Sequence, residues 1–211
     1  IHPVVTMVTN SAPPSADKPS LLTPDEASTL FHEFGHALHQ LLSNSTYPGV
    51  SGTSVARDFV ELPSQIMEHW VLEPEVLKVY AKHYQTGEVI PAELIEKLDK
   101  AGKFNMGFTT VEFLAAALLD MEYHVVAGQA EIDIREFEKT VLDKYGLIPE
   151  IKPRYRSTYF NHIWNSGYAA GYYSYYWSEM LDADAFQAFK ETGDIFNREI
   201  AARFENEILS K

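Results

Sequence analysis

Two histidines four residues apart, inside a segment with strong helix signals, constrain this chain more than any other feature. Thr23-Pro24-Asp25-Glu26 has the pattern of a capping box with proline at the first helical position. Apolar side chains then recur at helical spacing up to about Leu42. Such a helix carries His32 and His36 on one face, so both imidazoles can reach the same metal ion.

Glu33 completes the pattern H-E-x-x-H. It lies one step round the helix from His32, close enough to hold a water on the metal without being a ligand. Zinc lowers the pKa of such a water towards neutral, and a carboxylate can then take the proton. A five-residue pattern also arises by chance. Here the pattern lies in the middle of a predicted helix, which favours a catalytic metal site over a chance match. We therefore predict one Zn²⁺ per chain and Glu33 as general base.

An open catalytic zinc site needs a third protein ligand. The chain has no cysteine, and no histidine follows at the spacing used by metzincins. A carboxylate on a second helix, predicted for about residues 58–72, is the remaining solution, and we take Glu61 as this ligand. Asp58 and Gln65 share its polar face and are candidates for orienting a ligand, whereas we assign Glu68 to an ordinary solvated face. We expect His39 to be a packed or surface residue rather than a ligand.

The rest of the chain is predominantly helical in pattern. We expect further helices at about 74–85, 91–101, 104–126, 133–145, 169–190 and 194–209. Residues 3–9 are β-branched and apolar and predict one short strand, for which the chain offers no partner. Since the chain also lacks an initiator methionine, we expect the partners of this strand to lie upstream, in a longer protein.

Composition narrows the classes of partner. The net charge of −13 disfavours binding to nucleic acid and to anionic membrane surfaces. Hydrophobic residues make up 45% of the chain, enough for a packed core. The absence of cysteine fits a cytoplasmic protein, although a periplasmic or otherwise exported one remains an alternative because the true N-terminus is not seen.

Beyond the zinc pattern, the sequence resembles a known family. The run His32-Glu33-Phe34-Gly35-His36-Ala37-Leu38-His39, followed by Phe59-Val60-Glu61-Leu62-Pro63-Ser64-Gln65, looks like the thimet oligopeptidase family of zinc peptidases. The interval from His32 to Glu61 fits that family, as does the aromatic stretch from Tyr159 to Tyr175. Residues 113–121 and 153–159 favour its bacterial dipeptidyl carboxypeptidase branch.

The resemblance implies a mainly α, zincin-type catalytic region, with one short N-terminal strand, that is part of a larger channel-enclosing fold. Residues 1–211 would be the C-terminal catalytic portion of a longer peptidase, completed by the missing N-terminal part. The substrates would be short peptides, from which C-terminal dipeptides are released. An endo-acting oligopeptidase of the same family is the first alternative. A helical domain that binds metal only structurally, or not at all, is the alternative from another class.

Tyr168, Tyr172 and Tyr175 follow each other at spacings of four and three, which predicts one face of a helix. A stripe of this kind is usually part of a core. Phenols beside Gly167 and Gly171, however, also suit a mobile segment that brings O–H groups to an oxyanion. The resemblance implies that Tyr168 and Tyr175 contact substrate and transition state, that His162 assists, and that Tyr172 contacts substrate.

Arg154 and Arg156 belong to the densest basic cluster in the chain. In an extended segment, two residues two positions apart point the same way. An enzyme that releases dipeptides must recognise the terminal carboxylate, and both arginines are candidates for binding it. The alternative is that they pair with acidic residues and hold the segment in place.

Overall fold

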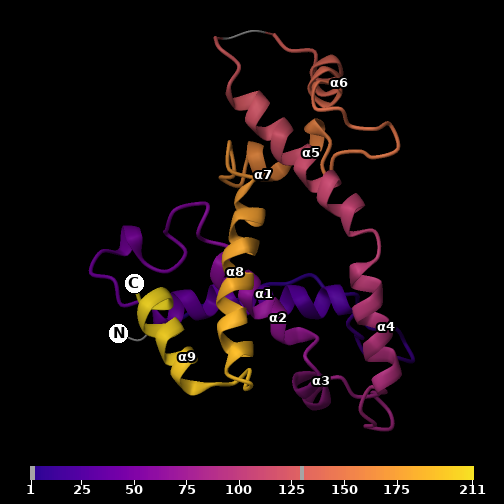
Figure 1. The fold of residues 1–211 in the computed structure, drawn as a ribbon, viewed down its shortest axis with the longest axis vertical. Helices are drawn as coiled ribbons and strands as arrows, with labels where there is room; N and C mark the ends of the chain where they lie inside the picture. Colours follow the sequence, from indigo (N-terminus) through magenta and orange to yellow (C-terminus); the bar gives the residue numbers. More distant parts are fainter. Residues whose placement is uncertain (1–2, 129–130) are drawn as a thin grey trace. The chain divides into compact units, whose positions relative to one another are not determined.

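The computed structural model describes residues 3–128 and 131–211, and helices dominate it, as predicted (Figure 1). The chain divides into two compact units. The first contains the residues up to Lys97 together with Tyr176–Lys211, and the second contains Leu98–Tyr175. No helix in the described ranges is long and apolar enough to cross a membrane.

The first unit is built from helices at both ends of the sequence. It contains α1 (Pro24–Leu42), η1 (Pro48–Val50), α2 (Leu62–Val71), α3 (Pro74–Tyr80), the start of α4 (Ala92–Lys103), most of α8 (Ser174–Glu191), α9 (Arg198–Phe204) and the π-helical turn η3 (Glu205–Leu209). Ile66 of α2 packs with Phe186 and Phe189 of α8 in its core. A hydrogen-bonded pair also joins these helices, with His69 Nε2 2.6 Å from the Oδ1 of buried Asp182.

The predicted capping box at the start of α1 is confirmed. Thr23 Oγ1 accepts a hydrogen bond from the backbone N–H of Glu26 at 3.2 Å, and Glu26 accepts one from the N–H of Thr23 at 2.7 Å. The second carboxylate oxygen of Glu26 accepts from the N–H of Ala12 at 2.8 Å. These backbone donors lower the pKa of Glu26 and tie the preceding loop to the first turn of the helix.

Gly35 lets α1 and α2 approach each other closely. A Cβ atom at Gly35 would lie 2.1 Å from the carbonyl oxygen of Pro63 and 2.5 Å from the Cα of Ser64. These are backbone atoms of the first turn of α2, so no side-chain movement could relieve the contact. The glycine in the middle of H-E-x-x-H therefore sets the distance between the helix that carries both histidines and the residues that follow Glu61.

The second unit contains α5 (Met106–His124), α6 (Ile134–Lys144), η2 (Ser157–Tyr159) and α7 (Asn161–Trp164). Asp133 caps α6 by accepting hydrogen bonds from the N–H groups of Arg135 and Glu136. The small residues Ala116 and Ala117 of α5 pack with Phe160, Ile163 and Tyr172 in its core.

Several predicted boundaries were wrong for a common reason. The helix predicted from 58 starts only at Leu62, the one predicted to 85 ends at Tyr80, and the one predicted from 169 starts at Ser174. Near each of these ends the chain forms turns, at residues 57–61, 84–86 and 169–173. Local apolar spacing continued through these turns and so overstated the helices.

The strand predicted for residues 3–9 is not formed. Its side chains are mostly exposed, with Val4 at 91% and Val8 at 87%. Within the described part of the chain the only β pairing is an isolated bridge between Lys82 and Val89. An extended segment without a neighbour leaves its N–H and C=O groups to water, and so forms no ladder.

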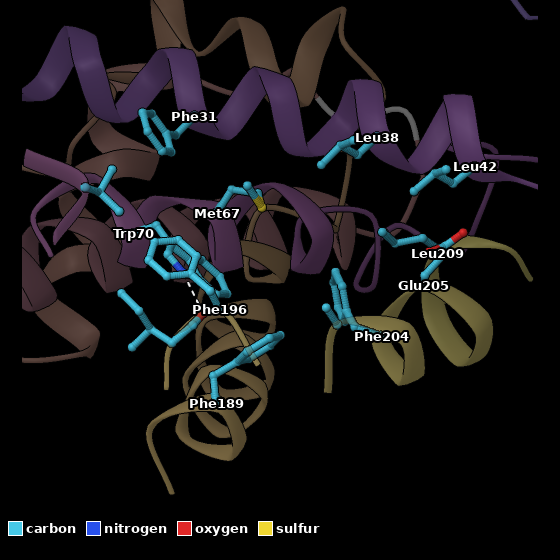
Figure 2. A pocket seen from close by; sticks show the side chains of 13 residues that line it. Phe31, Leu38, Leu42, Met67, Trp70, Phe189, Phe196, Phe204, Glu205 and Leu209 are labelled. Atoms are coloured by element: carbon cyan, nitrogen blue, oxygen red, sulfur yellow. Dashed lines mark hydrogen bonds between the residues drawn. The ribbon is translucent and has the colours of Figure 1, made fainter. Parts of the chain in front are cut away.

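An apolar cavity of about 420 Å³ lies in the first unit, between α1, α2 and the last helices (Figure 2). Helix α1 lines it with Phe31, Leu38 and Leu42. At 100° per residue these side chains lie roughly a third of a turn away from His32 and His36. The cavity and the metal-binding pattern therefore occupy different faces of the same helix.

The close approach at Gly35 yields a first prediction. Gly35→Ala should push α2 away from α1, lower the stability by about 1–3 kcal/mol, and reduce metal content because Glu61 moves away from the histidines. Thermal unfolding and metal analysis of the purified protein test this. Gly49→Ala is the matched control, since nothing lies within 4 Å of a Cβ at that position. Full metal content in Gly35→Ala would contradict the proposed role of the glycine.

Candidate metal and active site

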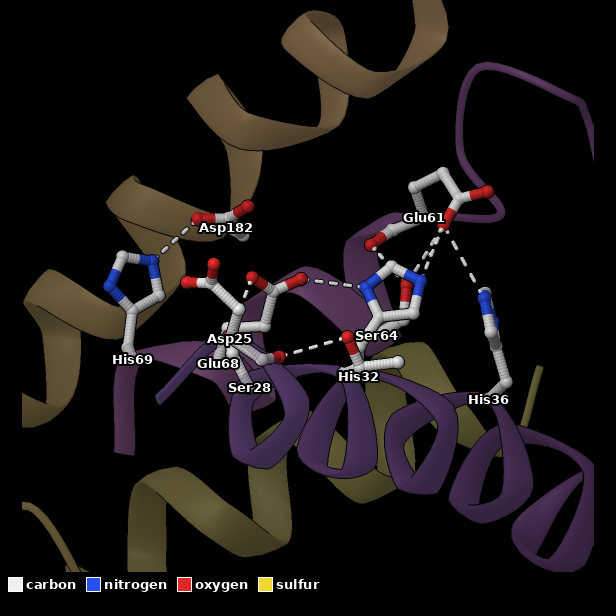
Figure 3. Close-up of polar contacts among 10 residues, drawn as sticks. Asp25, Ser28, His32, His36, Glu61, Ser64, Glu68, His69 and Asp182 are labelled. Carbon is white, nitrogen blue, oxygen red and sulfur yellow. Dashed lines mark hydrogen bonds and ion pairs between the residues drawn. The ribbon is translucent and has the colours of Figure 1, made fainter. Parts of the chain in front are cut away.

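Two imidazoles and one carboxylate converge in the first unit. His32 and His36 point from α1 towards Glu61, which immediately precedes α2 (Figure 3). The Nε2 atom of His32 lies 3.2 Å from Glu61 Oε2, and the Nε2 atom of His36 lies 3.3 Å from the same oxygen. One ligand atom from each residue lies within 4.8 Å of the others, so these three residues form a group that can hold a metal ion.

The distances from Glu61 Oε2 to the two imidazole nitrogens, 3.2 and 3.3 Å, match the spacing of donors around one small tetrahedral ion. Bonds of about 2.0–2.1 Å at tetrahedral angles place neighbouring donors roughly 3.3 Å apart. The carboxylate of Glu61 is buried, with 2% of the residue exposed. Ser64 donates hydrogen bonds to the Glu61 carbonyl oxygen at 2.8 Å and to Oε2 at 3.1 Å. A buried carboxylate between two imidazoles is the donor set that zinc prefers.

Glu68 holds His32 from the side opposite Nε2, the nitrogen that faces Glu61. Its Oε1 lies 2.6 Å from His32 Nδ1, and its Oε2 accepts a hydrogen bond from Ser28 at 3.1 Å (Figure 3). A carboxylate at Nδ1 fixes the proton there and leaves the Nε2 lone pair for a metal. The assignment of Glu68 to a solvated face was therefore wrong. Its spacing of seven from Glu61, two turns of one helix face, was the signal available in the sequence.

The two carboxylates beside His32 favour its protonated form. Burial lowers the pKa of His32, but its hydrogen bonds with Glu61 and Glu68 outweigh burial and raise the pKa to about 9. A metal must displace this proton from Nε2, so its affinity should increase as the pH rises towards about 9.

The other predicted residues of the first unit occupy distinct positions. Glu33 is half-buried on α1, next to His32 in the sequence. His39 is fully buried, and burial, followed by the nearby His36, lowers its pKa. It is therefore packed, as expected. Asp58 precedes α2, so it does not share a helix face with Glu61, and its carbonyl accepts a hydrogen bond from Ser178 at 3.3 Å. Gln65 lies on α2, and its role in orienting a ligand stays a prediction.

The second unit gathers the predicted aromatic residues into one cluster. The rings of Tyr168 and Tyr175 stack, with centroids 5.3 Å apart and planes 16° apart. The ring of His162 lies edge-on to them, at 6.0 Å from Tyr168 and 6.2 Å from Tyr175. They meet through a turn rather than along one helix face, because α8 begins only at Ser174.

Tyr172 belongs to the core of the second unit. Only 2% of it is exposed, its ring stacks on Phe113 at 4.7 Å, and burial raises the pKa of its phenol. This environment matches the core stripe that the sequence left open as the alternative, and it does not support substrate contact by Tyr172.

The two arginines differ in their surroundings. The Nε of Arg156 pairs with a carboxylate oxygen of buried Glu138, and Glu138 also accepts hydrogen bonds from the N–H and hydroxyl of Ser157. This pairing fits the alternative in which an arginine holds the segment in place. Arg154 is exposed, with its guanidinium 6.0 Å from the centroid of the Tyr155 ring.

The contact between Glu68 and His32 yields a second prediction. Glu68→Gln should weaken zinc binding by roughly 10–100-fold, because the imidazole loses the carboxylate that fixes its tautomer and orientation. Competition with a chelator measures the dissociation constant without relying on catalysis. Glu75→Gln, on the first turn of α3, is a control that should bind zinc like the wild type. An unchanged dissociation constant in Glu68→Gln would show that Glu68 has no role in holding the metal.

A model of peptidase family M3 matches residues 1–211. The chain is 48% identical over 212 residues to dipeptidyl carboxypeptidase of Escherichia coli (strain K12) and 47% identical to that of Salmonella typhimurium (strain LT2). Both alignments cover 100% of this chain and 31% of the relative. Probable cytosolic oligopeptidase A of Arabidopsis thaliana is 44% identical over 214 residues, covering 99% of this chain and 30% of that protein.

The chain thus spans about a third of the length of these relatives. The family match extends over all of its residues, including the H-E-x-x-H helix, Glu61 and the aromatic segment. The family membership predicted from the sequence is confirmed: the chain belongs to peptidase family M3, a family of metallopeptidases.

Proposed function

We propose that the protein containing this chain is a zinc peptidase that hydrolyses short peptides and releases dipeptides from their C-termini. The observation that carries the proposal is the convergence of His32 and His36 on one carboxylate oxygen of Glu61, at 3.2 and 3.3 Å. Dipeptidyl carboxypeptidases that are 47% and 48% identical to the chain support the type of cleavage.

His32, His36 and Glu61 would hold one zinc ion. When bound, zinc supplies a Lewis acid that polarises the scissile carbonyl and lowers the pKa of a water molecule. Glu33 accepts the proton of the attacking water and delivers it to the leaving amine. Glu68 keeps the Nδ1 proton of His32 in place throughout, through their 2.6 Å hydrogen bond.

The phenols of Tyr168 and Tyr175 donate hydrogen bonds to the developing oxyanion, and His162 assists them. Their stacked arrangement supports joint action, since donors that are already ordered lose little freedom when the substrate reacts. The zinc site and this cluster belong to different units, so the proposal for the tyrosines rests on the family resemblance and on the geometry of the cluster itself.

The remainder of the longer protein would complete a channel around the peptide, with residues 1–211 as its C-terminal catalytic portion. Exposed apolar side chains near the start of α5 support such a partner within the same protein. Phe104 is 76% exposed, Met106 55% and Phe108 43%. Isolated apolar residues are common on protein surfaces, but several exposed apolar side chains close together are typical of a surface that packs against another part of the protein. A cytoplasmic location remains a prediction from the absence of cysteine.

An endo-acting oligopeptidase is the second candidate. It is favoured by the 44% identity to a probable oligopeptidase A, which is nearly as high as the identity to the dipeptidyl carboxypeptidases. The two candidates share the zinc site and differ in whether the C-terminus of the peptide is recognised.

A third prediction separates the general base from the metal ligands. Glu33→Gln should keep one zinc ion per protein and lose roughly 10²–10⁴-fold in kcat, because an amide cannot accept the proton. Metal analysis and peptide hydrolysis are measured on the same preparation. Asp25→Asn changes an exposed carboxylate on the same helix and should leave both unchanged. Loss of zinc from Glu33→Gln would instead identify Glu33 as a ligand.

A fourth prediction concerns the oxyanion. Tyr175→Phe should lower kcat by about a hundredfold or more with little change in KM, because the hydroxyl acts in the transition state. Tyr159→Phe, at a residue that is 60% exposed, serves as the control and should retain activity. Normal kcat in Tyr175→Phe would return Tyr175 to a purely structural role in the aromatic cluster.

A fifth prediction distinguishes the two candidate functions. Amidating the C-terminus of a substrate should raise KM sharply, and Arg154→Ala should abolish the difference between acid and amide, since Arg154 is an exposed residue whose cation can pair with a carboxylate. Arg156→Ala should lower stability, because it leaves buried Glu138 without its cation, and should preserve the discrimination. Mass spectrometry of the products gives the cleavage sites. Equal cleavage of both peptides at internal bonds would favour the oligopeptidase.

A further inference from the structure

The second unit contains a fully buried carboxylate that has no role in the proposed reaction. Asp120 lies on α5 and is 0% exposed. Its Oδ1 accepts a hydrogen bond from the backbone N–H of Ala170 at 2.9 Å, and its Oδ2 accepts one from the N–H of Tyr172, also at 2.9 Å. Both donors belong to the loop between α7 and α8, about 50 residues further along the chain.

His124 completes the environment of this carboxylate. It lies one helical turn after Asp120, and its Nδ1 is 2.9 Å from Asp120 Oδ1 and 2.8 Å from the Asp120 carbonyl oxygen. The backbone N–H of Ala170 lies farther from Nδ1, at 3.3 Å. Because the two nearest neighbours of Nδ1 are acceptors, we assign its proton to their side. Burying a carboxylate is costly unless donors satisfy it, and Asp120 receives three: two backbone N–H groups and one imidazole. Two of the three come from a single loop.

The loop adopts a backbone conformation that needs such support. Ala170 has a φ of +52°, in the left-handed region that a side chain disfavours. Its N–H is one of the two groups bound to Asp120. Further hydrogen bonds within the loop join the N–H of Tyr168 to the carbonyl of His162 at 3.0 Å and the N–H of Gly171 to the carbonyl of Tyr168 at 2.8 Å.

Tyr168 and Tyr175 flank the two residues that Asp120 holds. Tyr168 lies two positions before Ala170, and Tyr175 lies three positions after Tyr172. The stacking of their rings at 5.3 Å depends on the turn between them, because they do not share a helix. Asp120 is thus the buried group that fixes the backbone on which both phenols are carried.

We infer that Asp120, supported by His124, is a positioning residue that holds residues 168–173 of this loop so that the Tyr168 and Tyr175 hydroxyls are ordered before substrate arrives. This inference rests on the proposed function for the role of the two phenols, but the anchoring of the loop is independent of it. The residues beside Gly167 and Gly171, which the sequence suggested could form a mobile segment, would then be held to α5 by hydrogen bonds to Asp120.

The test combines hydrogen exchange with a double-mutant cycle in the zinc-loaded, full-length protein. Asp120→Asn keeps the shape of the side chain but places an amide N–H₂ against a backbone donor. Exchange of the amides in residues 168–173 should become roughly tenfold faster or more, while exchange in α6 stays unchanged. The value of kcat should fall about tenfold or more, with KM altered much less. Glu122→Gln, two residues along α5, removes the negative charge that pairs with Lys144 and should change neither quantity.

The double variant decides whether Asp120 acts through the tyrosines. If it does, Asp120→Asn combined with Tyr175→Phe should have a kcat close to that of Tyr175→Phe alone, because the hydroxyl to be positioned is already absent. Additive losses of kcat would overturn the inference, as would unchanged exchange of the loop in Asp120→Asn. If Asp120→Asn does not fold, His124→Gln can replace it, because it removes only one of the three donors to Asp120. This variant should show a smaller increase in amide exchange of residues 168–173 and a smaller loss of kcat. Wild-type exchange of the loop in His124→Gln would count against the inference.

The same measurements separate this inference from the proposed function. Wild-type kcat in Tyr175→Phe would refute the role of that phenol in the reaction. Faster exchange of residues 168–173 in Asp120→Asn would still establish Asp120 as the anchor of the loop.

Discussion

The close crossing of α1 and α2 at Gly35 is the contact on which the candidate site depends. With no side chain at Gly35, the first turn of α2 approaches α1 until a Cβ would lie 2.1 Å from the Pro63 carbonyl oxygen. This approach brings Glu61 to within 3.3 Å of the two histidine nitrogens. A metal ion that needs donors about 3.3 Å apart tolerates little variation in that distance. The distance between α1 and α2 therefore determines whether His32, His36 and Glu61 can bind one metal ion together.

Buried carboxylates organise both units in a similar way. Glu61 in the first unit is 2% exposed, and Asp120 in the second is 0% exposed. Each is too costly to bury without compensation, and each has polar partners both nearby in the sequence and from a distant part of it. Glu61 draws together the histidines of α1, while Asp120 draws the loop at Ala170 towards α5. Other arrangements would leave a buried carboxylate without partners, and this energetic cost favours the observed arrangement in each unit.

Local signals predicted most helices because helix formation depends on neighbours in the sequence. The capping box at Thr23 and the N-cap at Asp133 act within three residues, and both helices begin where expected. The predicted helix from 169 failed for the complementary reason. Ala170 has a left-handed φ and its N–H is bound to Asp120, a residue 50 positions away, which no local pattern encodes.

The sequence alone was enough to predict the candidate ligand set, because His32, His36 and the interval to Glu61 follow from helix periodicity and a family pattern. Only the tertiary structure decided what surrounds these residues. The sequence predicts a solvated Glu68, but the packing of α2 against α1 places Glu68 Oε1 2.6 Å from His32 Nδ1. Whether a polar side chain faces water or another helix is a property of packing, and packing joins residues whose separation in the sequence carries no information about their distance in space.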